Sequence, residues 1–249
     1  MSNPIIESQN LNNVNNKDTT RGFYSTSQMA HDTFDLLNHL GWTTKVHLVG
    51  ISMGGMIAQE MSYAKPEYFQ SLCLTSTHAG SFPPIVGALT ILKMMFIRDR
   101  QKKIPIFVDL IFPKPWLTSP APSNSSYATN NEYLYDLLRQ RIMITKSATL
   151  TGTVGQIVAI LTHRVSRERL LHIRENIPRI LVNTGTWDNL VKPKNSYFLK
   201  DQLNADFHVF EGSGHGLPTE QAERYNAGLE DHFRKAGFVV AGSTNRSIL

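Results

Sequence analysis

Residues 46–55 read VHLVGISMGG, and this stretch decides the fold. Val46 to Val49 is typical of a short buried strand, and Met56 begins a segment of helical character that meets no breaker before Pro66. A strand that passes into a helix within about three residues forces the residue at the apex, Ser52, into a strained backbone conformation. The sequence therefore predicts a strand, a sharp Gly-x-Ser-x-Gly turn and a helix.

This turn is suited to holding a nucleophile. Gly50 and Gly54 are the positions where a Cβ is expected to clash with the neighbouring strand and helix. The turn lifts the Ser52 hydroxyl out of the sheet and places it at a helix N-terminus, which favours developing negative charge. The Met53 N–H is then the expected oxyanion donor. The alternative interpretation is a glycine-rich loop between two core elements.

Composition limits the classes of protein that the chain can belong to. With 249 residues, 41% of them hydrophobic, the chain can bury a full core. The formal charge of +5 is modest, and the densest charged run, residues 98–103, contains an acid and no aromatic residue. This argues against a nucleic-acid partner. The single cysteine, Cys73, excludes a disulfide framework and a cysteine-based zinc site.

The sequence shows neither a secretory signal nor a membrane span. The first twenty residues are polar and rich in asparagine, and the longest apolar windows are too short to cross a bilayer. A cytoplasmic protein without an integral membrane segment is expected.

Strands alternate with helices on both sides of a long insertion, which indicates a parallel α/β sheet. Strands are expected at residues 71–75, 179–184 and 207–210, besides the one before Ser52, and helices at 25–40, 195–203 and 219–235. We predict a disordered tail at 1–23, a core at 24–80 and 178–237, a helical cap at 81–177 and a C-terminal tail at 238–249. Apolar cap residues are expected either to line a substrate pocket or to form a core of their own.

Three strands end in residues that could act together. Ser52, Asp188 and His215 each follow the carboxyl end of a predicted strand, where function collects in parallel sheets. A serine hydroxyl needs an imidazole to take its proton, and a carboxylate must hold that imidazole in the correct tautomer. Taken singly, Asp188 could be a turn aspartate and His215 a surface histidine. Asp201 and Asp206 are rival acids, but neither lies at a strand's carboxyl end.

From residue 24 to about 233 the sequence resembles the α/β-hydrolase family, in its esterase, lipase and perhydrolase-like branch. The matching segments are YSTSQMAHDTFDLLNHLGW, GISMGGMIAQEM, ILVNTGTWDNLVKP and FEGSGHG. The resemblance implies Ser52 as nucleophile, Asp188 as acid, His215 as base and Met53 as one oxyanion donor. It also implies a helical cap that shapes the substrate pocket, and no metal or organic cofactor.

The chain departs from the family before the turn. The family places four strands ahead of the strand that carries the nucleophile, and a βαβ unit takes about thirty residues. Residues 1–24 leave no room for these strands and contain no His-Gly oxyanion loop. We therefore expect an N-terminally truncated fold with half of the oxyanion hole missing. The strand at 46–49 would then become a sheet edge, open to a partner or to a second copy.

Two functions of different kinds follow from these observations. The first is a serine hydrolase that acts on a carboxylic ester, thioester or lactone with an apolar part, through an acyl-serine intermediate. The loss of the N-terminal strands and of one oxyanion donor would impair its turnover. The second is a non-catalytic remnant of such an enzyme that binds a partner through its open edge. Acyl transfer to an acceptor other than water would use the same three residues.

Overall fold

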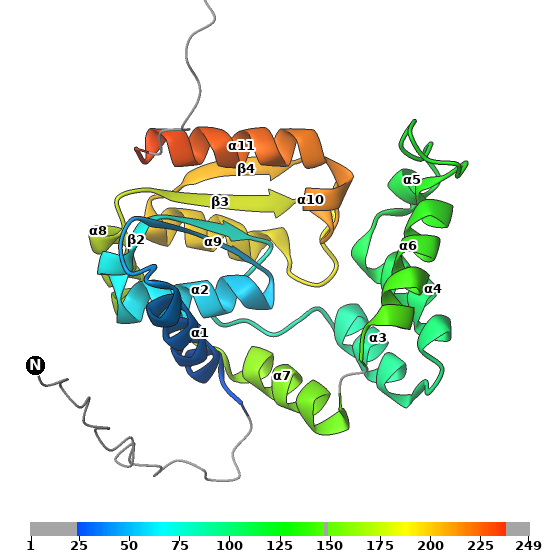
Figure 1. The fold of residues 1–249 in the computed structure, drawn as a ribbon, viewed down its shortest axis with the longest axis horizontal. Helices are drawn as coiled ribbons and strands as arrows, with labels where there is room; N and C mark the ends of the chain where they lie inside the picture. The colour runs from blue at the N-terminus through cyan, green and yellow to red at the C-terminus, as the bar shows by residue number, and fades with distance from the viewer. Residues whose placement is uncertain (1–23, 147–148, 238–249) are drawn as a thin grey trace, which may run out of the picture.

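The computed structural model describes residues 24–146 and 149–237. The tails expected at 1–23 and 238–249 lie outside this part of the chain. Four strands form one parallel sheet in the order β1-β2-β3-β4 (Figure 1). Their bounds are Val46–Ile51 for β1, Phe69–Thr75 for β2, Ile180–Gly185 for β3 and Asp206–Phe210 for β4. The four strands predicted from the sequence are confirmed, each to within two residues.

Helices cover both faces of the sheet. α1 and α2 lie on one side and α11 on the opposite side (Figure 1). Ser25 caps α1 through a reciprocal pair of hydrogen bonds with Gln28, which accounts for where that helix begins. The bounds are Thr26–Leu40 for α1, Met53–Ala64 for α2, Pro66–Tyr68 for the 3₁₀ turn η1, Pro193–Leu203 for α9, Leu217–Glu220 for α10 and Ala222–Lys235 for α11. The helix expected at 219–235 is thus divided into two.

The core follows the alternation of side chains along the strands. Leu72, Leu74 and Val182 point to the face that α1, α2 and α9 cover, and they belong to the main apolar cluster. The intervening Cys73 is fully buried, and Thr75 Oγ1 lies 3.0 Å from Tyr225 Oη of α11 on the other face. Both faces of β2 are therefore covered, as expected for an inner strand of a parallel sheet.

The insertion between β2 and β3 is helical, and the strands point toward it (Figure 1). α4 and α6 pack together around Ile104, Val108 and Leu134, so this part of the insertion has an apolar core of its own. Its helices are α3 (Ile85–Phe96), α4 (Arg100–Ile111), α5 (Lys114–Leu117), α6 (Asn130–Ile144) and α7 (Leu150–Thr162).

One helix of the stretch assigned to the cap packs elsewhere. α8, Arg167–Asn176, buries Leu170 and Ile173 in the main cluster against α2 and α9. The helical cap in this structure therefore comprises α3 to α7, and α8 extends the layer that covers the sheet. The sequence of α8 could not show whether this helix belongs to the cap or to the layer over the sheet, because helices in both places are amphipathic.

β1 lies at one edge of the sheet formed by the described strands. Val49 and Ile51 of this strand are exposed, at 37% and 41%. Within residues 24–146 and 149–237, no helix is long and apolar enough to cross a membrane.

Candidate active site

Ser52 occupies the turn between β1 and α2 with φ 54° and ψ −121°, a conformation that is strained for a residue with a side chain. Two hydrogen bonds from the neighbouring strand segment hold it there. The Ser52 N–H donates to the Thr75 carbonyl at 2.9 Å, and Thr77 Oγ1 donates to the Ser52 carbonyl at 2.7 Å. The strained turn predicted from the sequence is present.

The two glycines named in this turn differ in their surroundings. A Cβ on Gly50 would lie 2.6 Å from the Gly54 carbonyl oxygen and 2.6 Å from Gly55 Cα, so that position requires glycine. A Cβ on Gly54 would meet nothing within 4 Å, so the expectation of a clash there is wrong. The second tight position is Gly55, where a Cβ would lie 2.7 Å from the Thr77 side chain. In the first turn of α2, Gly55 faces the segment after β2, whereas Gly54 does not.

Asp188 and His215 meet beyond the carboxyl ends of β3 and β4. His215 Nδ1 and Asp188 Oδ2 are 2.8 Å apart, and the two residues are only 8% and 5% exposed. The other carboxylate oxygen, Oδ1, accepts hydrogen bonds of 2.8 Å from the Leu190 and Val191 N–H groups. Asp188 is therefore fixed in place, and with Nδ1 as the donor, His215 keeps the lone pair of Nε2 for a proton.

The loop that carries His215 is anchored by the cap. The N–H groups of His215 and Gly216 donate to the Ile111 carbonyl at 3.0 and 3.3 Å, at the end of α4. A Cβ on Gly214 would lie 2.6 Å from the same carbonyl oxygen, and one on Gly216 would overlap the Phe112 ring. These two glycines allow the cap to approach the histidine loop closely, so the end of α4 helps to hold His215 in place.

All three residues lie at the same edge of the sheet, because each follows the carboxyl end of a parallel strand. The structure joins Asp188 to His215 directly, whereas no hydrogen bond connects Ser52 Oγ with His215 among the described residues. Catalytic hydrogen bonds are often long before substrate binds. Met53 is the first residue of α2, so its N–H has no acceptor within the helix and is available to an oxyanion.

A cavity of about 380 Å³ adjoins Ser52, and its walls come from α2, the segment after β2, the cap helices α3 and α7, and the loop after Asp188. Its wall residues are mostly apolar: Met56, Pro83, Ala88, Ile91, Leu92, Met95, Ile157, Ile160, Leu161, Leu190 and Val191, besides Ser52 and His78. The volume is typical of a site for a small ligand.

Among the apolar residues of the cap, Met95 lines this cavity. Phe112 and Trp116 pack in the core of the cap. A second cavity of about 600 Å³ lies within the cap, away from Ser52, and Met95 borders both. The described residues contain no group of three His, Cys, Asp or Glu side chains that could hold a metal ion.

Comparison with known proteins identifies the family. The model of the family described as alpha/beta hydrolase fold matches residues 13–221. The chain belongs to the α/β-hydrolase fold family. The fold predicted from the sequence is thereby confirmed, whereas the expected lack of strands before β1 stays a prediction, because residues 1–23 lie outside the described part of this hydrolase-family chain.

Its relatives carry the names of hydrolases. A protein named as a carbamate hydrolase, RutD, from Stutzerimonas stutzeri (strain A1501) is 24% identical over 225 residues, covering 88% of this chain and 77% of the relative. A thermophilic esterase from Thermogutta terrifontis has a TM-score of 0.66 at 21% identity, covering 87% of this chain and 75% of the esterase. A meta-cleavage product hydrolase from Pseudomonas fluorescens IP01 has a TM-score of 0.66 at 18% identity, covering 88% and 75%.

Sequence reasoning missed Glu220 of α10, which lies beneath the histidine loop of this hydrolase fold. Its two carboxylate oxygens each lie 3.0 Å from the Gly214 nitrogen, next to His215. Burial raises the pKa of Glu220 from its ordinary value of 4.5 to about 7, against the opposing effect of the Gly214 N–H. No pattern marks this residue in the sequence, because its burial comes from the packing of α10 under the loop.

Glu220→Gln is expected to change how stability depends on pH. The pKa of Glu220 is higher in the folded state than in the unfolded state, so its contribution is fully present below pH 4.5 and is lost as the pH rises to about 7. Glutamine keeps an oxygen for the Gly214 N–H and cannot ionise. As the pH rises from 4.5 to 7, the unfolding free energy of the variant should therefore rise relative to that of the wild type, by at most about 3 kcal/mol. The partial exposure of Glu220 makes the expected change smaller than this limit. Urea unfolding at pH 5 and pH 8 measures this, and equal pH dependence in both proteins would contradict it.

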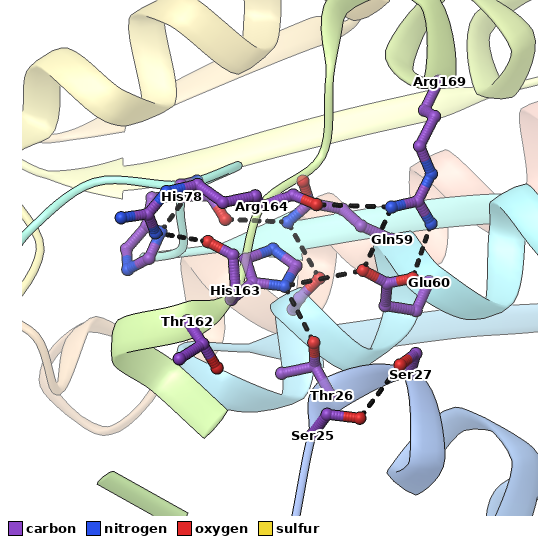
Figure 2. A network of polar contacts seen from close by, with 12 residues as sticks. Ser25, Thr26, Ser27, Gln59, Glu60, His78, Thr162, His163, Arg164 and Arg169 are labelled. Carbon is purple, nitrogen blue, oxygen red and sulfur yellow. Dashed lines mark hydrogen bonds and ion pairs between the residues drawn. The ribbon is translucent and has the colours of Figure 1, made fainter. Parts of the chain in front are cut away.

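A largely buried polar network surrounds Glu60 and His163 (Figure 2). Arg169 Nη2 of α8 and Glu60 Oε2 of α2 are 2.5 Å apart, and His163 Nδ1 forms a hydrogen bond of 2.9 Å with Thr26 Oγ1 of α1. His163 Nδ1 also lies 3.7 Å from Glu60 Oε1, but burial lowers the pKa of His163 to about 3, so the ring is neutral. Arg169 is thus the partner that balances the Glu60 charge, and the network links α1, α2 and α8.

Proposed function

We propose that this chain is a serine hydrolase that cleaves a carboxylic ester, thioester or lactone through an acyl-Ser52 intermediate. The observation that carries the proposal is the 2.8 Å contact between His215 Nδ1 and the buried Asp188 carboxylate, at the sheet edge where Ser52 is held in a strained turn. A serine hydroxyl is activated for attack on a carbonyl carbon by an imidazole that a carboxylate holds in place, which is the arrangement proposed here.

In the proposed mechanism His215 Nε2 takes the proton of the Ser52 hydroxyl while Oγ attacks the substrate carbonyl carbon. The carbonyl oxygen becomes an oxyanion that accepts a hydrogen bond from the Met53 N–H. As the tetrahedral intermediate collapses, His215 returns its proton to the leaving alcohol, thiol or ring oxygen. A water molecule then attacks the acyl-enzyme by the same steps, which releases the acid and restores Ser52.

Asp188 is suited to its role in two ways. Its Oδ2 fixes the proton of His215 on Nδ1, so that Nε2 is the basic atom, and it stabilises the imidazolium that forms during attack. Two backbone N–H groups bind Oδ1 and hold the carboxylate in place while His215 gains and loses a proton.

The cavity beside Ser52 supports a substrate with an apolar part, because its walls are almost entirely hydrocarbon. The relatives are named for carbamate, ester and meta-cleavage product hydrolysis. Hydrolysis of a carbamate or an ester begins with attack on a carbonyl carbon, which is what the proposed residues would perform here.

The experiment that tests the proposal is active-site labelling of the folded chain. A fluorophosphonate probe should modify Ser52 in the wild type, and mass spectrometry of the peptide identifies the site. Ser52→Ala should not be labelled, and His215→Ala should be labelled far more slowly. A wild-type protein that is folded by circular dichroism yet neither labelled nor active on p-nitrophenyl esters would remove the proposal.

A second candidate function is partner binding through the edge of the sheet. It is favoured by the position of β1, which no other described strand covers on its outer side, and by exposed Val49 and Ile51. A dimer or complex in which β1 gains protection from amide exchange would support this function. A monomer with measurable ester turnover would contradict it.

A further inference from the structure

His78 is the one polar side chain besides Ser52 in the wall of the cavity. It follows β2 by three residues, and its exposed fraction is only 3%. The nearby wall residues, such as Met56 and Ile91, are apolar. A polar group in such surroundings costs free energy unless it has a partner, so its presence there calls for one.

The backbone of the following residues fixes the position of the proton on this ring. The N–H groups of Gly80 and Ser81 both point at His78 Nδ1, at 3.1 and 3.2 Å. Nδ1 must therefore be the acceptor, and the proton of the neutral ring lies on Nε2. Because Nδ1 accepts from the loop of its own chain, Nε2–H is the remaining polar group of this ring in the cavity wall, and no described residue accepts from it.

The ring is neutral at neutral pH. Burial, followed by the charge of Arg164, lowers the pKa of His78 to about 4. With Nδ1 occupied and Nε2 protonated, the ring has no free lone pair and cannot act as a base. Its available chemistry is that of a single, uncharged hydrogen-bond donor.

The backbone of His78 is hydrogen-bonded to α2 (Figure 2). Its carbonyl accepts a hydrogen bond of 3.1 Å from Gln59 Nε2, and the same amide group donates to the Gly55 carbonyl at 3.0 Å. Gln59 is fully buried on α2, the helix that begins directly after Ser52. The donor on His78 is therefore tied to the element that positions the proposed nucleophile, and such pre-organisation favours selective recognition.

We propose that His78 determines specificity by donating a hydrogen bond from Nε2 to an uncharged oxygen within the part of the substrate that enters the cavity. The preferred substrates are then esters that carry a keto, ether or second ester oxygen in an otherwise apolar chain, rather than plain alkyl esters. This proposal rests on the proposed function, because it takes the cavity beside Ser52 as the substrate site.

Two variants separate the donor from the rest of the ring. His78→Asn places an oxygen near the position of Nδ1, where it can accept from Gly80 and Ser81, and leaves nothing in place of Nε2. His78→Gln places an amide N–H near the position of Nε2 and leaves the loop without its acceptor. The first therefore preserves the loop and removes the donor, and the second does the reverse.

The kinetic test compares p-nitrophenyl pentanoate with p-nitrophenyl esters of equal chain length that carry an oxo group at carbon 3 or 4. A second comparison uses pairs of esters in which the alcohol part is either a plain alkyl chain or a chain of equal length with an ether oxygen. In the wild type, one oxo or ether ester should exceed its plain analogue in kcat/KM on the order of tenfold. His78→Asn should abolish this ratio, and His78→Gln should retain part of it. Because each ratio is taken within one protein, a loss of folded protein does not affect it.

Binding gives a test that needs no turnover. In Ser52→Ala, nitrogen-15 NMR of the imidazole should assign the His78 proton to Nε2. Titration with methyl 4-oxopentanoate should shift that proton, whereas methyl pentanoate should not. Failure of the proposed function would appear as absent Ser52 labelling, and this binding result would still decide the role of His78. A proton on Nδ1, equal responses to both ligands, or equal kinetic ratios in wild type and His78→Asn would each overturn the inference.

Discussion

Ser52→Ala and His215→Ala are each expected to lower kcat/KM for ester hydrolysis by a factor of about 10⁴–10⁶, because either change removes acyl transfer as a whole. The double variant should be hardly worse than either single one, since residues that act as a unit are not additive. The measurement is steady-state hydrolysis of a p-nitrophenyl ester. Single variants that keep more than a tenth of wild-type activity would contradict the assignment of the nucleophile and the base.

Asp188→Asn separates the role of charge from that of structure. The asparagine oxygen can still accept from the Leu190 and Val191 N–H groups that now bind Asp188 Oδ1. Its amide group, however, would donate to His215 Nδ1 and place the imidazole proton on Nε2, which is the wrong tautomer for a base. We expect kcat to fall by about 10⁴ with little change in unfolding temperature. A fall in stability without a fall in activity of the folded fraction would indicate a structural aspartate instead.

Gly50→Ala is expected to destabilise the protein by about 3 kcal/mol or more, or to prevent folding. The new Cβ would lie 2.6 Å from both the Gly54 oxygen and Gly55 Cα, which are backbone atoms. Neither can move without displacing the start of α2 from β1. Urea unfolding followed by circular dichroism measures the loss.

Gly54→Ala is the matched control from the same turn. A Cβ there would meet nothing within 4 Å, and the backbone of Gly54 does not have a positive φ. Alanine in the first turn of α2 should therefore be neutral or stabilise by up to about 1 kcal/mol. Equal losses in the two variants would show that the close packing around Gly50 does not control stability.

Much of the fold could be predicted because its signals are local. The run at 46–49, the glycine-rich turn and the helix after it lie within about twenty residues, and the N-cap at Ser25 and the stop at Gly41 mark α1 directly. The place of α8 could not be predicted in this way. Whether Leu170 and Ile173 pack against the sheet layer or within the cap depends on residues far away in the sequence.

The candidate site was likewise predicted only in part from the sequence. Order along the chain and position after a strand were enough to select Ser52, Asp188 and His215. The loop that carries His215 is held by the Ile111 carbonyl, which accepts from the His215 N–H, and by Glu220, which accepts from the Gly214 N–H, and no sequence pattern indicates either contact.

The sequence by itself determined the strand, turn and helix around Ser52, the parallel sheet, and which acid and histidine follow its strands, because hydrophobic period, glycine and capping residues act over a few positions. Only the tertiary structure decided which glycines are crowded, which helix belongs to the core, and that His78 lies in the cavity wall with its Nδ1 occupied by the loop. Burial depends on atoms that segments distant in sequence bring together, whereas the crowding at Gly50 and the proton position on His78 depend on the exact path of a tight turn within a few residues. All three exist only once the chain has folded.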